Sequence, residues 1–456
     1  MAWIWPVCML YFQRKTNVFW KKRIPVALMI LLSILKWYGM AAGSQLEQFY
    51  IPALLTWLYS VPFILDSYFY KKVGGYKACF LLPLGYATVE FVMSLLFFST
   101  LDSFAVTQFG NEPLMQLASV LGTYGISFLV VWFSTTVMFV IEKYEETKKI
   151  LKEPIAVYLT VLFIVLSFGG FRLAFIDTTV STVKIAVTTG NNVGVYTSDP
   201  PQRPIDDCIA SMLKDVQTAA GGGAELIHFC EEAFIVSADN KDKMISATEQ
   251  AAIKNHIDIL MALKVENPKG LNENKLYYID HEGNEVFEYE KSHLVPGVET
   301  GEYLQGDGHI PNYKATLPSG REIKLSTVIC MDSNFVGFIR EGTESDTQLL
   351  LVSTWDWKAI EDYHNKWVLY RSLENGFSTI RSTDDGYTTA IDPYGRELMI
   401  YSTDHSGRAN VSFVNIPMER FVTPYKAIGF IIDWFYPVGL LLLIGIGVTF
   451  NKRQRS

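Results

Sequence analysis

The chain has 456 residues, of which 49% are hydrophobic and only 19% are charged, whereas about 25% charged residues is usual for soluble proteins. This apolar content excludes a disordered chain. The 39 basic and 47 acidic residues give a formal net charge of −8, which argues against a protein that binds nucleic acid through its phosphates. The five cysteines show no C-x-x-C spacing, so we expect neither a disulfide scaffold nor a zinc site. Nothing else in the sequence requires a metal or a cofactor, and we expect none.

The hydrophobic residues are concentrated in two parts of the chain. About 20 apolar residues cross a ~30 Å hydrocarbon core, and six segments reach that length, namely 24–42, 49–69, 78–101, 114–141, 155–176 and 428–450. The opening twelve residues are too short to span and are expected to lie at the interface. The sequence therefore predicts an N-terminal membrane domain with about five spans over 1–176, an α/β domain over 177–427, and a transmembrane helix with a basic tail over 428–456.

The basic residues of the connecting loops predict the orientation of these spans, because Lys and Arg stay preferentially in the cytoplasm. Loops with and without basic residues alternate: 13–23, 70–77 and 142–154 carry them, whereas 43–48 and 102–113 carry none. We therefore expect a multi-pass protein of the cytoplasmic membrane, with the α/β domain on the extracytoplasmic side. A cleaved signal peptide over 14–44 is the less favoured alternative, because the apolar run is long and Lys36 interrupts it.

Two features inside the predicted spans allow more than one interpretation. Glu90 lies in the middle of a span, where a charge is costly and often functional, but a hydrogen-bonded packing residue explains it equally well. Gly122, Tyr124 and Gly125 are more typical of close helix packing than of a ligand contact.

The segment 177–427 alternates between strand and helix patterns, which favours a layered α/β domain. Turn signals at 282–284 and 393–395 predict hairpins. Helices are expected over 206–220 and 359–375, and strands over 183–190, 225–229, 257–263, 275–280, 323–330, 348–353, 387–392 and 409–416.

Three polar residues stand at the ends of apolar strands, where α/β domains tend to place their chemistry. They are Glu231, Lys291 and Cys330. A thiol attacks a carbonyl only as the thiolate, so it needs a base to take its proton. A carboxylate is such a base, and an ammonium can stabilise the oxyanion that follows. Spacing alone leaves the alternative open that Cys330 is a buried packing residue.

Several longer motifs carry a resemblance to a known family. They are QFGNEPLMQLASVLGTYGISFLVVWF (108–133), YEKSHLVPGVE (289–299), VICMDSNF (328–335), RSLENGFSTIRSTDDGYTTAIDPYG (371–395) and TPYKAIGFIIDW (423–434). With these motifs the chain resembles the nitrilase (carbon–nitrogen hydrolase) superfamily, and more narrowly its membrane-bound apolipoprotein N-acyltransferases. The resemblance implies an α-helical membrane domain, a nitrilase-like αββα sandwich outside the cytoplasm and one closing C-terminal helix.

The resemblance also implies a catalytic set. Glu231 matches the family's general base, Lys291 its catalytic lysine and Cys330 its nucleophile. Glu299 matches a further essential glutamate, which would orient the lysine or assist proton transfer; a structural salt bridge is the alternative. Met331 would supply a backbone N–H to the oxyanion hole.

The chain departs from the family pattern around these residues. The family's W-P-E is here F-C-E, and a second carboxylate, Glu232, follows it. Its Tyr-Glu after the cysteine is here Met-Asp, with Asp332 in place of Glu. Its S-N-D-A-W-F is here STWDWK, with Asp356 at the alanine position; Trp357 then matches an aromatic near the active site or simply packs. These departures are those expected of a divergent paralogue.

Two histidines, His293 and His364, are candidates for the base of a cysteine enzyme. Since Glu231 fills that role in the resemblance, structural or surface positions are favoured for both.

The expected function is a two-step acyl transfer. A phospholipid in the bilayer would donate an acyl chain to Cys330, and the resulting thioester would pass it to the N-terminal amine of a lipoprotein. A membrane-tethered amidase with water as the acceptor is the main alternative, since Glu232 and Asp356 would make the site more polar. A catalytically silent binding module is the third.

Overall fold

The computed structural model describes residues 2–16, 24–38, 47–96, 103–176, 179–189, 204–402 and 410–453. Contacts between residues divide the chain into two compact units. The helical unit comprises Met1–Ile176 and Ala427–Ser456, and the α/β unit comprises Asp177–Lys426. The small residues at 41–44, where a signal peptide would be cleaved, and the last basic residue, Arg455, lie outside the described residues.

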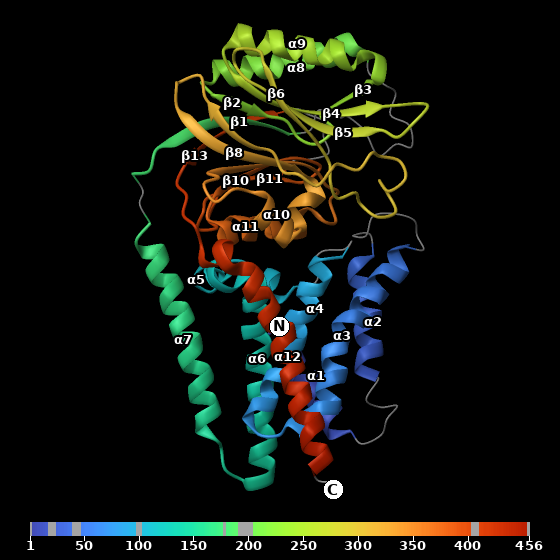
Figure 1. Ribbon diagram of the computed structural model, residues 1–456, viewed down its shortest axis with the longest axis vertical. Helices are drawn as coiled ribbons and strands as arrows, with labels where there is room; N and C mark the ends of the chain where they lie inside the picture. The colour runs from blue at the N-terminus through green and yellow to red at the C-terminus, as the bar shows by residue number, and fades with distance from the viewer. Residues whose placement is uncertain are drawn as a thin grey trace. The chain divides into compact units, whose positions relative to one another are not determined.

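The helical unit consists of long apolar helices with shorter ones between them (Figure 1). Among the described residues, four segments are long and apolar enough to cross a membrane: Phe49–Val73, Ala118–Thr147, Lys152–Ala174 and Pro424–Thr449. The helices of the unit are α1 (Trp5–Lys15), α2 (Ile24–Trp37), α3 (Glu47–Val73), α4 (Leu81–Ser94), α5 (Glu112–Met115), α6 (Ala118–Thr147), α7 (Lys152–Ala174) and α12 (Pro424–Arg453).

Two of the six predicted spans, 24–42 and 78–101, contain shorter helices than expected. The helices found there, α2 and α4, have 14 residues each, fewer than the roughly 20 that cross a bilayer. α4 begins only after a 3₁₀ turn, Tyr76–Phe80, and most of its residues are buried within the unit. Its apolar side chains therefore serve packing more than lipid contact.

The polar and glycine residues inside the spans have structural roles. Glu90 is buried and accepts hydrogen bonds from Ser127 Oγ at 2.8 Å and from the backbone N–H of Phe104 at 3.2 Å, as a hydrogen-bonded packing residue does. Gly122 has a φ of +67° at a kink within α6, a conformation that residues with a Cβ rarely adopt.

The α/β unit contains two mixed sheets. One has the strand order β13-β1-β2-β4-β5-β6, with β3 paired to β4, and the other has the order β12-β11-β10-β9-β8-β7. The strands are β1 (Thr182–Thr189), β2 (Leu226–His228), β3 (Phe234–Ser237), β4 (Asp258–Glu266), β5 (Glu273–Ile279), β6 (Glu285–Glu290), β7 (Asn312–Thr316), β8 (Glu322–Ile329), β9 (Leu349–Trp355), β10 (Ser378–Asp384), β11 (Tyr387–Ile391), β12 (Glu397–Ser402) and β13 (Asn410–Pro417).

The two sheets pack face to face between two layers of helices (Figure 1). Helices α8 (Ile205–Gly221) and α9 (Lys241–Asn255) cover the first sheet, and α10 (Val336–Gly342) and α11 (Glu361–Asn375) cover the second. Hydrogen bonds join the sheets, for example from Ser353 Oγ to the carbonyl of Phe229 at 2.9 Å. This arrangement confirms the αββα sandwich that the resemblance implied.

The predicted strands and helices of this unit are found close to their expected bounds, and both predicted hairpins are present. The sequence did not predict β3, β7 and β10, nor helices α9 and α10. Glu231 and Cys330 follow strands in the middle of each sheet, β2 parallel to β4 and β8 parallel to β9, whereas Lys291 follows the edge strand β6, which is antiparallel to β5. The ends of β2, β6 and β8 bring these residues, distant in sequence, to one region.

Candidate active site

Cys330 lies where strand β8 gives way to a helical turn, η5 (Cys330–Asn334). It has a φ of +46°, a left-handed conformation that costs a residue with a Cβ roughly 1–2 kcal/mol and that is often found at functional sites. The residue is only 6% exposed. Its Sγ lies 3.7 Å from the carbonyl oxygen of Trp355 at the end of the neighbouring strand, β9.

Glu231 follows strand β2 and is buried with both carboxylate oxygens hydrogen-bonded. Its Oε1 accepts from Lys291 Nζ at 2.8 Å and from Asn274 Nδ2 at 2.8 Å. Its Oε2 accepts from the backbone N–H of Trp355 at 2.7 Å. The carboxylate is thus tied to the strand end that also contacts the Cys330 thiol.

Lys291 follows strand β6 and is 1% exposed. Besides Glu231, its Nζ donates to Glu299 Oε1 at 2.6 Å. The other oxygen of Glu299 accepts from the backbone N–H of Val295 at 2.7 Å. The Lys291 ammonium is therefore hydrogen-bonded to two buried carboxylates, which restricts the position of its charge.

The charges of this set act on the thiol. Burial raises the pKa of Cys330 well above its usual value, and the negative charge of Glu231 raises it further, while Lys291 opposes both. Burial alone would lower the pKa of Lys291, but Glu231 and Glu299 outweigh it and the pKa is raised. Burial also raises the pKa of Glu299. The resting site therefore holds a neutral thiol beside a charged lysine, and the thiolate forms only when a base accepts the proton.

Asp332 connects the turn of the cysteine to the loop of the lysine. Its carboxylate accepts from Tyr289 Oη at 2.7 Å, from the N–H of Ser292 at 3.4 Å and from the N–H of Ile329 at 3.2 Å. It also accepts from the N–H and the Nδ1 of His293, at 2.7 and 2.8 Å. The residue that replaces the family's Glu thus fixes the two segments relative to each other, and His293 has a structural position.

One further contact residue, Asn274, was missed by the sequence analysis. It lies in strand β5, 1% exposed, and its side chain orients Glu231. Its backbone carbonyl also accepts from the N–H of Lys291 at 3.0 Å. The strand, ENKLYYI, begins with three polar residues, and no local pattern distinguishes the second of them.

The sequence analysis also placed Met331, Glu232 and Trp357 at or near the site. Met331 is the second residue of the turn η5 and is 9% exposed; the first N–H groups of a helical turn have no acceptor within it, as an oxyanion hole requires. Trp357 lies half-buried in the segment between β9 and α11. Glu232 is buried with a φ of +49°, and burial raises the pKa of its carboxyl to about 7.

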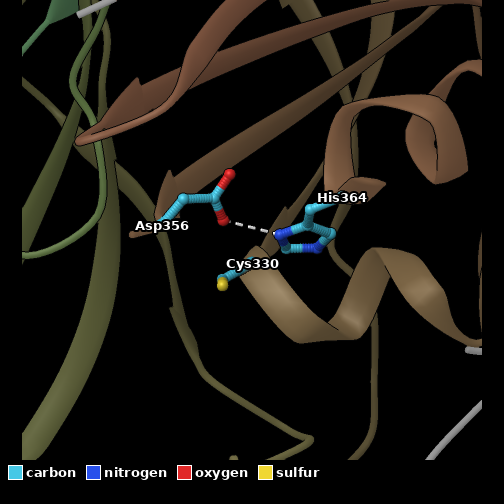
Figure 2. A group of neighbouring side chains, drawn as sticks. All are labelled: Cys330, Asp356 and His364. Carbon is cyan, nitrogen blue, oxygen red and sulfur yellow. Dashed lines mark hydrogen bonds and ion pairs between the residues drawn. The ribbon is translucent and has the colours of Figure 1, made fainter. Parts of the chain in front are cut away.

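His364, the other histidine of the sequence analysis, lies on α11 beside the nucleophile (Figure 2). Its Nδ1 is 2.7 Å from Asp356 Oδ1. Arg381, from the central strand β10, forms an ion pair with the second oxygen, Asp356 Oδ2. Burial alone would raise the pKa of Asp356, but Arg381 and His364 outweigh it, so the pKa lies below its ordinary value.

An αββα sandwich with a glutamate, a lysine and a cysteine buried together at its strand ends is the architecture expected of a nitrilase-type protein. The model of the carbon–nitrogen hydrolase family matches residues 193–422, about half of the chain. The chain belongs to this family. Residues 1–136 match a second model, the apolipoprotein N-acyltransferase N-terminal domain.

Individual proteins are similar to this chain in sequence or in structure. An apolipoprotein N-acyltransferase of Rickettsia prowazekii is 27% identical over 63% of this chain and 60% of its own length. One from Rickettsia bellii is 23% identical over 80% of this chain and 77% of its own. An amidase from Nesterenkonia sp. has a solved structure that covers 56% of this chain and 97% of its own, with 18% identity and a TM-score of 0.45. The chain thus spans less than two thirds of the first of these relatives.

Proposed function

We propose that this protein is a membrane-bound N-acyltransferase that moves an acyl chain from a phospholipid to the amine of a lipoprotein through a thioester on Cys330. The observation that carries the proposal is the buried set in which Lys291 is held between Glu231 and Glu299 beside a cysteine in a left-handed turn. The match of residues 1–136 to the acyltransferase N-terminal domain supports this choice over a soluble amidase.

In the first step Glu231 accepts the proton of the Cys330 thiol, and the thiolate attacks the ester carbonyl of the phospholipid. The negative charge moves to the carbonyl oxygen, where Lys291 and the N–H of Met331 stabilise it. When the tetrahedral intermediate collapses, the C–O bond breaks and Glu231 returns the proton to the leaving alkoxide. A lysophospholipid and an acylated cysteine are the products.

In the second step an amine attacks the thioester. Glu231 accepts the proton of the attacking nitrogen, and the same donors stabilise the new oxyanion. The C–S bond then breaks, the thiolate of Cys330 regains a proton from Glu231, and an amide is formed. Water entering at this stage would release a fatty acid instead, which is the amidase-like outcome.

Intact-protein mass spectrometry tests the thioester. We expect the wild-type protein incubated with phospholipid to gain the mass of one acyl chain, which hydroxylamine removes. Cys330→Ala should gain none, whereas Cys208→Ala, which removes a buried cysteine of helix α8, should behave as wild type. An adduct that survives in Cys330→Ala, or no adduct with any phospholipid, would contradict the proposal. Product formed in proportion to added lipopeptide amine separates transfer from hydrolysis.

We further propose that the α/β unit lies on the extracytoplasmic side of the cytoplasmic membrane, because the basic loops alternate along the chain. Single cysteines test this in a background where all five native cysteines, Cys8, Cys79, Cys208, Cys230 and Cys330, are alanine. Ser319→Cys, in the exposed turn between β7 and β8, should react with a membrane-impermeant maleimide in intact cells. A cysteine in the exposed loop before α7, at position 149, should react only after lysis. The reverse pattern would contradict the orientation.

A further inference from the structure

A pocket of about 470 Å³ lies in the helical unit, at the ends of three of its helices. Its lining comes from the last turns of α1 and α3, from the glycines that follow α3, and from the last turns of α6. A volume of this size is typical of a ligand site. All lining residues belong to the helical unit, whereas the residues assigned to acyl transfer belong to the α/β unit. The pocket is therefore a second candidate site, separate from Cys330.

A buried ion pair fixes the floor of this pocket. The side chain of Arg14 is 4% exposed, and its Nε and Nη2 donate to the two carboxylate oxygens of Asp66 at 3.0 and 2.9 Å. The guanidinium lies 3.4 Å from the centre of the Tyr70 ring, and the Tyr70 hydroxyl donates to Glu142 Oε2 at 2.7 Å. Such two-point pairing restricts both side chains. The floor is thus satisfied without a ligand and joins α1, α3 and α6.

The rim of the pocket carries charges that are held much less tightly. Lys15 pairs with Glu145, and the two side chains are 41% and 37% exposed. Lys143 pairs with Glu146 at 2.6 Å, again between exposed side chains. Lys71 is exposed, and its ammonium has no ion pair or hydrogen bond among the residues that the structure describes. Ion pairs as exposed as these contribute little to stability, so their members can exchange partners for a ligand.

The positive and negative charges of the pocket balance. Four basic residues of the lining are matched by three glutamates and by Asp66, which pairs with the floor arginine. The basic residues are Arg14, Lys15, Lys71 and Lys143, and the glutamates are Glu142, Glu145 and Glu146. A ligand with one charge would leave an excess of its own sign in the pocket. A zwitterion takes one partner of each sign from the exposed pairs and keeps the balance, which is the complementary choice.

The surroundings of the pocket favour a lipid over a soluble zwitterion. Two of the segments long and apolar enough to cross a membrane, Phe49–Val73 and Ala118–Thr147, end at the pocket, which places it at the level of the lipid headgroups. Tyr11 lies one turn before Lys15 on α1 and is 46% exposed, and Ile64 lies two turns before Lys71 on α3 and is 48% exposed. Residues so spaced share a helix face. Exposed apolar surface therefore leads from the rim toward the bilayer interior.

We propose that this pocket binds a phospholipid whose headgroup carries a phosphate and a primary ammonium, as in phosphatidylethanolamine. The phosphate lies between Lys71 and Lys15, and the ammonium pairs with Glu145, which Lys15 releases. The acyl chains follow Tyr11 and Ile64. With the basic loops on the cytoplasmic side, this lipid belongs to the cytoplasmic leaflet. It is a resident ligand of the helical unit and is not the acyl donor, so the inference goes beyond the proposed function.

Photocrosslinking of the full chain locates this lipid. The protein is placed in phosphatidylcholine nanodiscs that contain a small fraction of phosphatidylethanolamine with a diazirine in its acyl chain, and peptide mass identifies the labelled segments. We expect label on the peptides that contain Tyr11 and Ile64. Lys71→Glu should reduce it at least tenfold, because like charges would meet, and Glu145→Gln should reduce it several-fold. Lys152→Glu, the same change at an exposed lysine of α7 outside the pocket, should leave it unchanged.

Competition in the unaltered protein keeps the proposal testable if a variant does not fold. Unlabelled phosphatidylethanolamine should displace the label, whereas phosphatidylglycerol, which lacks the ammonium, should not. Equal competition by phosphatidylglycerol overturns the zwitterionic site, and displacement by free phosphoethanolamine at the same concentration overturns the assignment to a lipid. Absence of label from both peptides overturns the site itself. None of these readouts requires turnover, so failure here leaves the proposed acyl transfer untouched, and a protein without acyltransferase activity can still show the site.

Discussion

Lys291 is the residue whose removal should most change both stability and activity. It is 1% exposed, and its ammonium is shared by Glu231 and Glu299 at 2.8 and 2.6 Å. Lys291→Met keeps the length of the side chain but leaves two buried carboxylates without their cation. Breaking a buried ion pair in this way costs about 3–5 kcal/mol. For a unit of this size, that corresponds to a lowering of the melting temperature by roughly 6–20 °C.

The companion variant Glu299→Gln should be milder. It keeps the ion pair of Lys291 with Glu231 and removes one charge-assisted hydrogen bond, which is worth about 1.5–3 kcal/mol. In the double variant, one of the two stranded carboxylates is already neutral. We therefore expect the double variant to be less destabilised than the sum of the single ones, by about 1–3 kcal/mol.

Tryptophan fluorescence during thermal unfolding of the detergent-purified protein provides the assay. In Lys291→Met the unpaired carboxylates should have raised pKa values in the folded protein. The loss of stability relative to wild type should therefore be present at neutral pH. It should shrink as the pH falls toward about 4.5, where the glutamates of the unfolded chain also bind protons. Acyl-adduct formation should be lost in the same variant. Strictly additive effects, or a melting temperature equal to that of wild type, would refute the shared-cation reasoning.

Three further outcomes concern Asp332, His228 and Gly306. Asp332→Asn should lower stability by about 1.5–3 kcal/mol and slow acylation at least tenfold. The carboxylate accepts hydrogen bonds from Tyr289 and His293, and the NH₂ group of an amide cannot accept them. Burial lowers the pKa of His228 to about 3, so stability should fall by up to about 5 kcal/mol as pH drops from about 6.5 toward 3, since the unfolded histidine binds the proton first. Gly306→Ala should displace the end of strand β6, because its Cβ would lie 2.2 Å from the carbonyl oxygen of Glu290, and thermal melting should show the loss.

Each of these has a control within the chain. His228→Gln keeps a donor toward Ser353, whose Oγ lies 3.0 Å from the histidine Nε2, and should flatten this part of the pH profile; an unchanged profile would show that other groups cause it. Gly337→Ala, in helix α10 where a Cβ meets only Glu341 at 3.9 Å, should melt as wild type. If Asp332→Asn acylates at the wild-type rate, its hydrogen bonds do not position the reacting groups.

The sequence predicted the parts of the fold that follow from apolar periodicity. β4 and β9 are buried almost throughout, and continuous apolar runs are typical of such central strands. β10 was missed although it is also central, because its seven residues, STIRSTD, are mostly polar. Their burial is made possible by partners from other segments, such as the bond from Ser382 Oγ to the carbonyl of Thr188 at 2.6 Å. Those partners are distant in sequence, so no local pattern reveals them.

The sequence predicted even less of the candidate site. Spacing alone only placed Glu231, Lys291 and Cys330 at strand ends, and the resemblance was needed to group them. The geometry then added Asn274 and the linking role of Asp332, both of which depend on contacts across 39 or more residues of sequence. Such contacts are properties of the assembled sheets, and a single sequence carries no direct record of them.

The charge arrangement explains how a buried thiol with a raised pKa can serve as a nucleophile. Moving its proton to solvent would add a negative charge to a site that already holds Glu231 and Glu299 against Lys291. Moving the proton to Glu231 instead keeps the net charge constant, because the carboxyl becomes neutral as the thiolate forms. Attack on the ester then shifts that charge to an oxygen beside the lysine, again without net change. In a low-dielectric site, proton transfers of this kind create no additional net charge at any step and so avoid its energetic cost. The base must therefore lie inside the site, as Glu231 does.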